Sequence, residues 1–365
     1  MYPVRLAFDV GPLHGHRTGI GAAVAHLADA LGDRDDLVLS PYLLSFRARP
    51  TAGVRRLPMP AAAAHRMWAR SDHPTMDRWL EGTDVVHGTN YVVPPTRRPA
   101  VVSVYDCWFL RQPERAAPAV RRAGEVLRRR VAAGASVHTS SAATASWVTE
   151  LLGTKDVHVV HLGPLDVPAS PTYAPAGWLS PLHGVPYVLS VGTIERRKNT
   201  PGLVRAFAGA DLPPEVRLVL AGAPGDDADA LDEAIDAQPV AVRSRVMRPG
   251  AVDGATKAWL LHHATVVAYP SLDEGFGFPI LEAQQVGVPI VASSAGSIPE
   301  VAGAGAALVP VGDDDALGAA LVTTIDDQER RRELVAAGHA NVARFSWSAT
   351  ADAMVALYHQ LLEDR

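Results

Sequence analysis

Short apolar runs alternate with longer amphipathic stretches along the first half of the chain. The runs are bounded by Gly, Pro or polar residues, which predicts buried strands at 4–10, 37–44, 84–87, 100–105, 136–139 and 157–160. Stretches with helical spacing separate them at 22–31, 62–80, 117–133 and 143–152. Alternation of this kind predicts an α/β fold, with a doubly wound parallel sheet covered by helices on both faces.

The same pattern starts again after a stretch with six prolines, 163–186. Further strands are predicted at 187–192, 216–221, 244–248, 265–269 and 288–292, and helices at 201–208 and 280–286. The last helix, 347–362, carries Trp347, Met354, Leu357, Tyr358 and Leu361 on one face. We therefore expect two Rossmann-like domains, 1–165 and 187–345, joined by a linker at 166–186 and followed by a C-terminal helix at 346–365.

Composition narrows the class of protein. A chain of 365 residues with 48% hydrophobic residues is long enough for two domains. The single cysteine, Cys107, excludes a disulfide framework and suits a reducing compartment. The N-terminus shows no signal segment, and no apolar run approaches the ~18 residues of a membrane span. Cysteine usage and the absence of a signal segment lead us to expect a cytoplasmic protein. The net charge of −5 argues against a nucleic-acid partner.

Candidate chemistry concentrates in residues 269–300. The predicted strand is followed by a glycine-rich turn and then by a helix with proline in its first turn, a geometry that presents free backbone N–H groups to an anion. The N–H groups of Gly277, Phe278 and Ile280 are the candidates. Two carboxylates, Glu274 and Glu282, frame the turn; the alternative is an ordinary βα loop with two surface glutamates.

The chain resembles the retaining, nucleotide-sugar-dependent glycosyltransferases of family 4 in four segments. These are VGTIERRKN (191–199), EGFGFPILEA (274–283), GVPIVAS (287–293) and SIPEVAG (297–303). The resemblance implies the GT-B fold, in which two Rossmann-like domains face each other across a cleft and the last helix crosses back to the N-terminal domain. It implies transfer of a hexose, with mannose as the expected sugar, from a GDP- or UDP-linked donor. The acceptor would be a saccharide or a polyprenol-linked compound bound by the N-terminal domain.

The resemblance also assigns roles to individual residues. Arg197 and Lys198 would contact the donor diphosphate, where a bidentate guanidinium and a compact ammonium complement each other. Glu282 would accept hydrogen bonds from the ribose hydroxyls, and Glu274 would lie near the transferred sugar as a catalytic residue. No cofactor or metal is expected, since GT-B enzymes generally need none, and the Asp-rich strings at 227–229 and 313–315 are interpreted as solvated turns.

One position departs from the family pattern. Relatives carry His-Asp after the strand that here reads SVYDCWFL, and that histidine contacts the donor sugar. In this chain Tyr105 and Asp106 occupy the two positions and are the catalytic candidates of the N-terminal domain. Tyrosine is a poor base at neutral pH, so the role passes to a neighbour such as His87, the donor differs, activity is reduced, or Tyr105 is an ordinary core residue.

The glycine-rich segment 11–21 follows the first strand. Gly19 and Gly21 would form a backbone cradle for a phosphate or sugar, and a tight turn is the alternative. A nicotinamide oxidoreductase is disfavoured because the second strand ends in Ser45-Phe46-Arg47 without the acidic residue such enzymes require. A nucleotide-sugar epimerase and a non-catalytic sugar-nucleotide-binding protein remain as alternatives.

The predicted helix 117–133 is rich in arginine. Arg121, Arg122, Arg128, Arg129 and Arg130 would suit peripheral contact with an acidic membrane that carries a lipid-linked acceptor. A solvated helix face is the alternative, because Glu125 lies within the same run.

Overall fold

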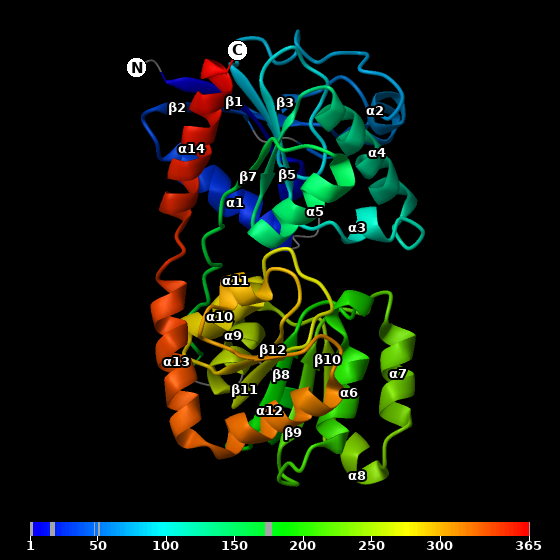
Figure 1. Cartoon of the computed structure of the whole chain (residues 1–365), viewed down its shortest axis with the longest axis vertical. Helices are drawn as coiled ribbons and strands as arrows, with labels where there is room; N and C mark the ends of the chain where they lie inside the picture. The colour runs from blue at the N-terminus through cyan, green and yellow to red at the C-terminus, as the bar shows by residue number, and fades with distance from the viewer. Residues whose placement is uncertain (1–2, 15–18, 47, 50–51, 172–176, 365) are drawn as a thin grey trace. The chain divides into compact units, whose positions relative to one another are not determined.

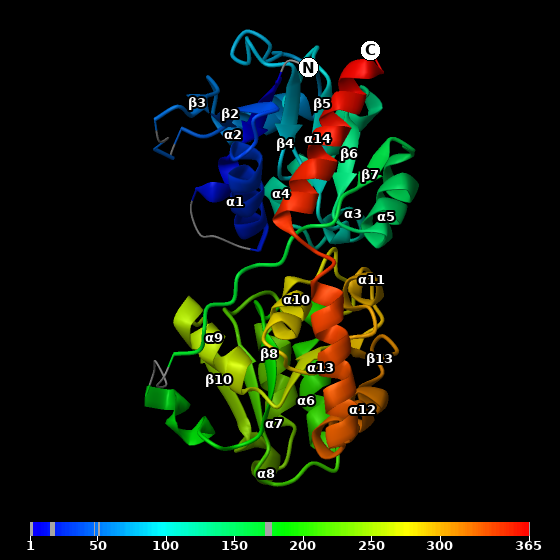
Figure 2. The same cartoon turned by 90° about the vertical axis from the view of Figure 1, so that its left-hand side faces the viewer.

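A computed structural model describes residues 3–14, 19–46, 48–49, 52–171 and 177–364. The chain divides into two compact units. The first contains residues 1–163 and 345–365, and the second contains residues 164–344. Each unit is an α/β layer structure built on a parallel sheet (Figures 1 and 2).

The first unit has a seven-stranded sheet in the described residues, with the order β3-β2-β1-β4-β5-β6-β7. The strands are β1 (Val4–Asp9), β2 (Leu37–Leu43), β3 (Arg55–Arg56), β4 (Val85–Gly88), β5 (Ala100–Val104), β6 (Ser136–Thr139) and β7 (Val157–Val159). The helices are η1 (Gly11–Leu13), α1 (Gly19–Gly32), α2 (Ala61–Trp68), α3 (Trp108–Arg111), α4 (Pro118–Ala132), α5 (Ala142–Leu152) and α14 (Trp347–Glu363). All strand pairs are parallel, as the alternating pattern predicted.

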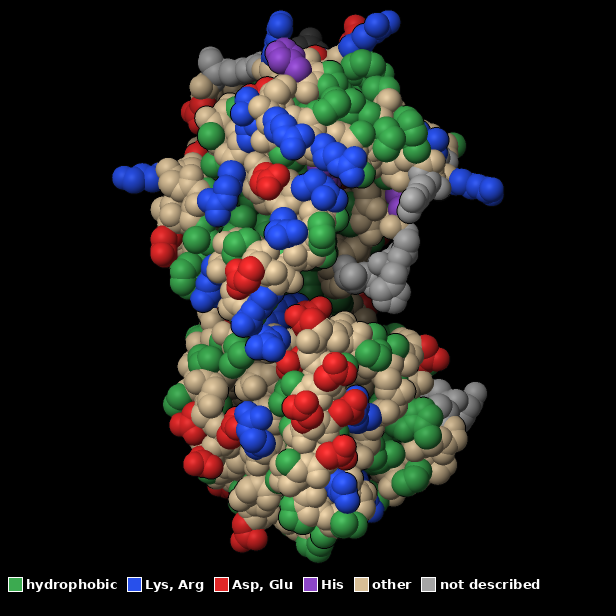
Figure 3. Space-filling model, turned by 90° about the vertical axis from the view of Figure 1, so that its right-hand side faces the viewer, with side chains coloured by type: hydrophobic (Ala, Val, Ile, Leu, Met, Phe, Trp, Pro, Cys, Tyr) green, Lys and Arg blue, Asp and Glu red, His purple; other side chains and the backbone are tan. Residues whose placement is uncertain are grey.

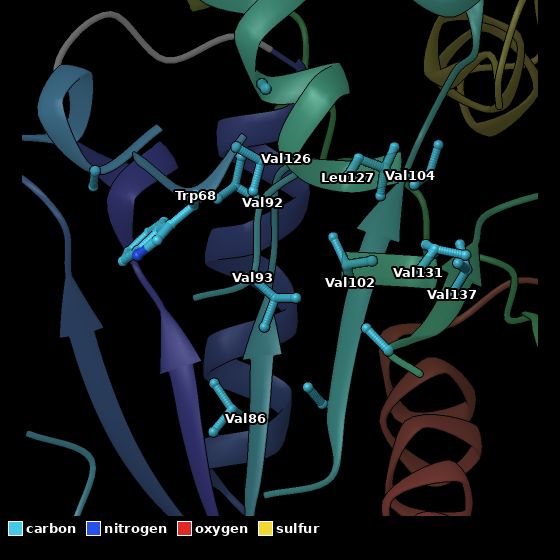
Figure 4. Close-up of a cluster of buried hydrophobic side chains, with 14 of the residues drawn as sticks. Trp68, Val86, Val92, Val93, Val102, Val104, Val126, Leu127, Val131 and Val137 are labelled. Carbon is cyan, nitrogen blue, oxygen red and sulfur yellow. The ribbon is translucent and has the colours of Figure 1, made fainter. Parts of the chain in front are cut away.

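Alternate residues of these strands enter two separate cores, because successive side chains of a strand point to opposite faces. On one face, Val102 and Val137 pack with α2 and with Val126, Leu127 and Val131 of α4 (Figure 4). On the other face, Leu6, Phe8, Val85 and Val101 pack with α1 and α14. The apolar face of the C-terminal helix therefore completes the core of the first unit.

The second unit has a six-stranded parallel sheet in the described residues, with the order β10-β9-β8-β11-β12-β13. The strands are β8 (Tyr187–Val191), β9 (Arg217–Ala221), β10 (Val246–Gly250), β11 (Val266–Tyr269), β12 (Ile290–Ser293) and β13 (Ala307–Val309). The helices are η2 (Gly177–Leu182), η3 (Arg196–Lys198), α6 (Thr200–Gly209), α7 (Ala228–Asp236), α8 (Val240–Arg243), α9 (Gly254–His263), α10 (Phe278–Gln285), α11 (Ile298–Ala302), α12 (Asp314–Asp326) and α13 (Gln328–Val342). Helices α9, α10 and α11 contribute to the core on one face, and α6, α7 and α12 to the core on the other.

Several expected boundaries were wrong. The helix expected at 62–80 ends at Trp68. The chain then turns, with the Ser71 hydroxyl accepting a hydrogen bond from the His73 N–H, and Pro74 could not continue a helix. The linker expected at 166–186 falls within the second unit, and its Leu179 and Leu182 are buried in that unit's core.

Candidate functional site

In the second unit, the order of the strands reverses between β8 and β11. Ligands of open α/β sheets bind outside the carboxyl ends of the strands at such a point. The segment after β8 carries Arg197 and Lys198, and the segment after β11 carries Glu274. The Leu272 N–H donates to the Arg197 carbonyl at 2.7 Å, so the two predicted motifs lie side by side.

Glu274 is the centre of this cluster, and its side chain is only 5% exposed. Its carboxylate accepts hydrogen bonds from Arg197 Nη1 at 2.8 Å, Lys198 Nζ at 2.5 Å and Ser271 Oγ at 2.7 Å. Burial by itself would raise the pKa of Glu274, but the two cations and the hydrogen bonds outweigh it and lower the pKa to about 2. Glu274 is therefore ionised at neutral pH and acts as an acceptor, and it cannot serve as a general acid.

The two cations have further partners that fix their positions. Lys198 Nζ also donates to the Tyr269 hydroxyl at 2.9 Å, and Arg197 Nε donates to Glu195 at 2.9 Å. Burial lowers the pKa of Lys198, and the neighbouring Glu274 opposes that shift. A guanidinium and an ammonium held together in a largely buried place can bind an anionic group without having to be ordered first.

Glu282 lies in α10 and is also buried, with a side chain 4% exposed. Its carboxylate accepts a hydrogen bond from Lys257 Nζ of α9 at 2.5 Å. Sequence reasoning missed Lys257 as a site residue. The available signal was rarity: Lys155, Lys198 and Lys257 are the only lysines of the chain, and two of the three contact the motif glutamates.

Glycines shape the backbone around both carboxylates. Gly277 has a φ of 106° at the N-terminus of α10, a conformation that favours glycine. At Gly296, with a φ of 50°, an added Cβ would lie 2.4 Å from the Glu274 carbonyl oxygen. Gly277 and Phe278 lie at the start of α10, where N–H groups have no partner within a helix. The Ile280 N–H, however, donates to the Gly277 carbonyl at 3.0 Å. We expected this N–H to be available to a ligand, and the structure contradicts that expectation.

The candidates of the first unit have other surroundings. Tyr105 is 6% exposed, its ring packs edge-on against His138, and burial raises its pKa to about 12. It cannot act as a base at neutral pH. Asp106 accepts hydrogen bonds from the Tyr91 hydroxyl at 3.1 Å and the Trp108 N–H at 3.2 Å, so it orders the turn between β5 and α3.

His87 is not a substitute for the missing family histidine. It is fully buried, with Nδ1 at 2.8 Å from the Tyr358 hydroxyl and Nε2 at 2.7 Å from Ser103 Oγ. Burial holds the pKa of His87 well below its ordinary value, with His138 adding to the shift. With both ring nitrogens engaged inside the core, His87 joins α14 to the sheet and does not reach a substrate.

Gly19 and Gly21 lie in the first turn of α1 and not in a loop before it. The expected helix start at Ala22 was therefore three residues late, because glycine is tolerated in a first turn where its N–H needs no helical partner. Residues 15–18 of the proposed cradle lie outside the described part of the chain.

The aspartate strings have structural partners. Asp313 accepts a hydrogen bond from the Ala316 N–H as the N-cap of α12, and Asp314 pairs with Arg205 at 2.7 Å. Asp227 is buried and lies 3.9 Å from Arg196. Among the described residues, no group of His, Cys, Asp and Glu side chains has the arrangement of a metal site.

Comparison with known proteins shows a similarity to glycosyltransferases in the second unit and in the fold. The family model of glycosyl transferases group 1 matches residues 180–340, which contain every residue of the Glu274 and Glu282 clusters. The resemblance seen in the motifs is thus confirmed for this part of the chain. Two α/β units with parallel sheets of seven and six strands in the described residues give the fold class of GT-B glycosyltransferases.

Particular relatives share parts of the sequence or the whole fold. O-antigen chain mannosyltransferase B of Escherichia coli is 35% identical over 163 residues, which are 44% of this chain and 42% of that protein. The match therefore spans less than half the length of that curated relative. The sucrose-phosphate synthase of Thermosynechococcus elongatus has a TM-score of 0.75 at 20% identity, with 100% of both chains covered. HepE of Anabaena, solved with UDP and glucose, has a TM-score of 0.70 at 19% identity, covering 97% of this chain and 99% of that one.

Proposed function

We propose that this protein transfers a hexose from a nucleotide-diphosphate sugar to an acceptor hydroxyl. The observation that carries the proposal is the pair of cations, Arg197 and Lys198, held on the buried Glu274 at the point where the strand order of the second sheet reverses. A departing diphosphate develops negative charge, and a preorganised cationic pair stabilises that charge at the moment it forms.

The donor is held by two parts of the site in this proposal. Arg197 and Lys198 bind the diphosphate, with the N–H groups of Gly277 and Phe278 available beside the start of α10. Glu282, which accepts a hydrogen bond from Lys257 Nζ, also accepts hydrogen bonds from the ribose hydroxyls. The complex of HepE with UDP and glucose supports a nucleotide donor, and the similarity to a mannosyltransferase of Escherichia coli supports mannose as the sugar. The donor of this proposal is a GDP- or UDP-linked sugar.

We further propose a metal-independent reaction with retention of configuration, as the family resemblance implies. Support for metal independence comes from the aspartates, because Asp313 and Asp314 are engaged in a helix cap and an ion pair. Arg197 and Lys198 supply the positive charge that a metal ion provides in other sites.

A saccharide or polyprenol-linked acceptor is the second substrate of this proposal. Peripheral contact with an acidic membrane has partial support from the surface of the first unit, where Lys and Arg side chains gather on one face (Figure 3). Arg121 is exposed, but Arg129 and Arg130 both pair with Asp72, and Arg130 is buried. In the described residues, no helix has the length and apolar character needed to span a bilayer.

A non-catalytic role as a sugar-nucleotide-binding protein is the second candidate function. The observation that favours it is Tyr105, which is buried and replaces the histidine of the family pattern. Such a protein would bind the donor and show neither transfer nor hydrolysis.

Thermal shift against a panel of GDP-, UDP- and dTDP-sugars tests the proposal. We expect one nucleotide class to raise Tm, with the shift lost in Lys198→Ala and in Glu282→Gln. Lys155→Ala is the matched control, because Lys155 is an exposed lysine of the first unit. Absence of any shift in the wild type would contradict the proposal, and donor binding without transfer or hydrolysis would select the non-catalytic role.

A further inference from the structure

The first unit contains a cavity of about 510 Å³ at the carboxyl ends of its strands. It lies where β1 and β4 pair and the strand order reverses, so it occupies the place at which open α/β sheets bind ligands. Its volume is within the range of small-molecule pockets. The lining includes Asp9 at the end of β1 and Asn90 after β4.

Both of these residues offer hydrogen-bond acceptors that the protein leaves underused. Asp9 accepts one hydrogen bond, from the Gly11 N–H at 2.8 Å to Oδ1, and no ion pair of the described residues includes it. Burial raises the pKa of Asp9 to about 7, while the Gly11 N–H acts in the opposite direction. The Asn90 side-chain Oδ1 is buried and has no hydrogen-bond partner among the described residues. Buried polar groups with so few hydrogen-bond donors cost free energy, so the Asp9 carboxylate and the Asn90 amide oxygen point to a ligand that supplies donors.

The backbone around Asn90 is held in an unusual conformation. Tyr91 has a φ of 60°, which is uncommon for a residue with a side chain. An added Cβ at Gly88 would lie 2.0 Å from the Val92 carbonyl oxygen, so the chain folds tightly back on itself between these residues. The Tyr91 N–H donates to the Ser103 carbonyl at 3.0 Å and fixes the turn. Strain of this kind is retained where the surrounding structure needs a side chain in one place.

The remaining walls are largely apolar and include the aromatic rings of Tyr42 and Trp68. Tyr42 donates its hydroxyl to the His87 carbonyl at 3.3 Å, and Trp68 donates its indole N–H to the Pro74 carbonyl at 3.2 Å, so both rings are fixed. Among the described residues, the lining contains no Lys or Arg. The other ionisable groups there are His14, Tyr91 and His65, and burial lowers the pKa of His65 with Arg122 adding to the shift.

We propose that this cavity binds an uncharged, polyhydroxylated ring of the acceptor, with Asp9 and Asn90 accepting hydrogen bonds from its hydroxyl groups. The inference rests on the proposed function for its biological meaning, because it assigns the class of the acceptor. Hydroxyl donors complement two acceptor atoms, and the fixed aromatic rings provide apolar contact for the carbon faces of a ring. A phosphate ester on that ring would bring its negative charge to Asp9, which is ionised above pH 7, so the cavity discriminates against it at such a pH.

Titration of the intact protein with small probes at pH 8, where Asp9 is ionised, and without any nucleotide tests this assignment. The neutral probes are methyl α-D-mannoside and myo-inositol, and the charged probes are mannose 6-phosphate and glucose 6-phosphate. We expect the neutral rings to bind more tightly than the phosphate esters by about tenfold or more, and Asp9→Asn to raise the Kd of the neutral rings by about tenfold. Asn90→Ala should weaken them as well, whereas Asp29→Asn, at an exposed position of α1, should leave them unchanged.

Three results would overturn the proposal: phosphate esters that bind as tightly as the neutral rings, an Asp9→Asn variant that binds like Asp29→Asn, or no binding of any neutral ring by the folded protein. Because nucleotide binding is measured separately, the two hypotheses fail differently. Neutral rings that bind to a protein without donor binding would leave the cavity assigned and the proposed transferase function wrong. If the protein binds the donor but Asp9→Asn does not change its affinity for the neutral rings, the assignment of the cavity is wrong and the proposed transferase function stands.

Discussion

Replacing Glu274 with glutamine should destabilise the second unit, and the loss of stability should be smaller at acidic pH than at neutral pH. The substitution keeps the size of the side chain and removes the charge that Arg197 and Lys198 share. Both cations are mostly buried, with side chains 24% and 14% exposed, so solvent compensates only part of the loss. Breaking a buried ion pair by removing one partner is strongly destabilising, since the other partner remains in a low-dielectric place.

The pKa of Glu274 gives the magnitude. The shift from 4.5 to about 2 corresponds to about 3 kcal/mol of stability at pH 7. Since the pKa of the folded state lies below that of the unfolded state, this contribution is fully present above pH 4.5 and is lost as the pH falls towards 2. Near pH 3.5 the difference between wild type and Glu274→Gln should therefore shrink to about 2 kcal/mol.

Urea unfolding at pH 7 and pH 3.5 measures this difference, and exchange of the β8 and β11 amides identifies the transition of the second unit. Glu195→Gln is the matched control, because Glu195 also accepts from Arg197 but is 37% exposed. An exposed pair of this kind contributes only about 0–1 kcal/mol. A Glu274→Gln variant as stable as Glu195→Gln at pH 7, or a loss that does not change with pH, would refute the reasoning.

Four further predictions concern buried polar groups elsewhere. Lys257→Ala leaves Glu282 without its cation and should lower stability by about 1–3 kcal/mol in urea unfolding, with Lys155→Ala unchanged. Tyr358→Phe removes the hydrogen bond to His87 and should cost about 1 kcal/mol, seen as faster amide exchange in α14. Burial lowers the pKa of His87, so its stabilising contribution is present above the ordinary pKa of about 6.5 and is lost below it; α14 should open more readily in acid. The pKa of Asp9 is raised from 3.8 to about 7, so the folded state loses stability as the pH rises from 3.8 to 7. Asp9→Asn should therefore raise Tm at pH 8 and leave it nearly unchanged at pH 4. Equal Tm values of wild type and variant at pH 8 would contradict this prediction.

The sequence predicted most strands of both sheets but missed the short edge strands β3 and β13, and it predicted helices less evenly. Strands of a parallel sheet are buried on both faces, so each appears as a continuous apolar run that is easy to recognise. The helix expected at 62–80 illustrates the weakness, because an apolar spacing that continued past Trp68 concealed a chain reversal before Pro74. Helices α3, α7, α8, α9 and α11 were not predicted. Helices α12 and α13 were missed as well, since Ala-rich and charged segments have little amphipathic contrast.

The candidate site was predicted in pieces. Arg197, Lys198, Glu274 and Glu282 were each identified from their motifs. The hydrogen bonds that join Glu274 to the two cations cross 77 and 76 residues of sequence, and no local pattern contains that contact. Lys257 was missed for the same reason, because its partner lies 25 residues away on another helix.

The amino-acid sequence by itself determined the α/β class, the two repeats of the strand–helix pattern and the amphipathic face of the last helix, because these depend on the periodicity of neighbouring residues. Only the tertiary structure decided which side chains are chemically available. Burial between β4 and α14 turned His87 from a candidate base into a structural link. Asp9 was not a candidate from the sequence, yet it lines a cavity and its carboxylate accepts one hydrogen bond. Availability depends on burial and on long-range partners, and both arise only when distant segments pack together.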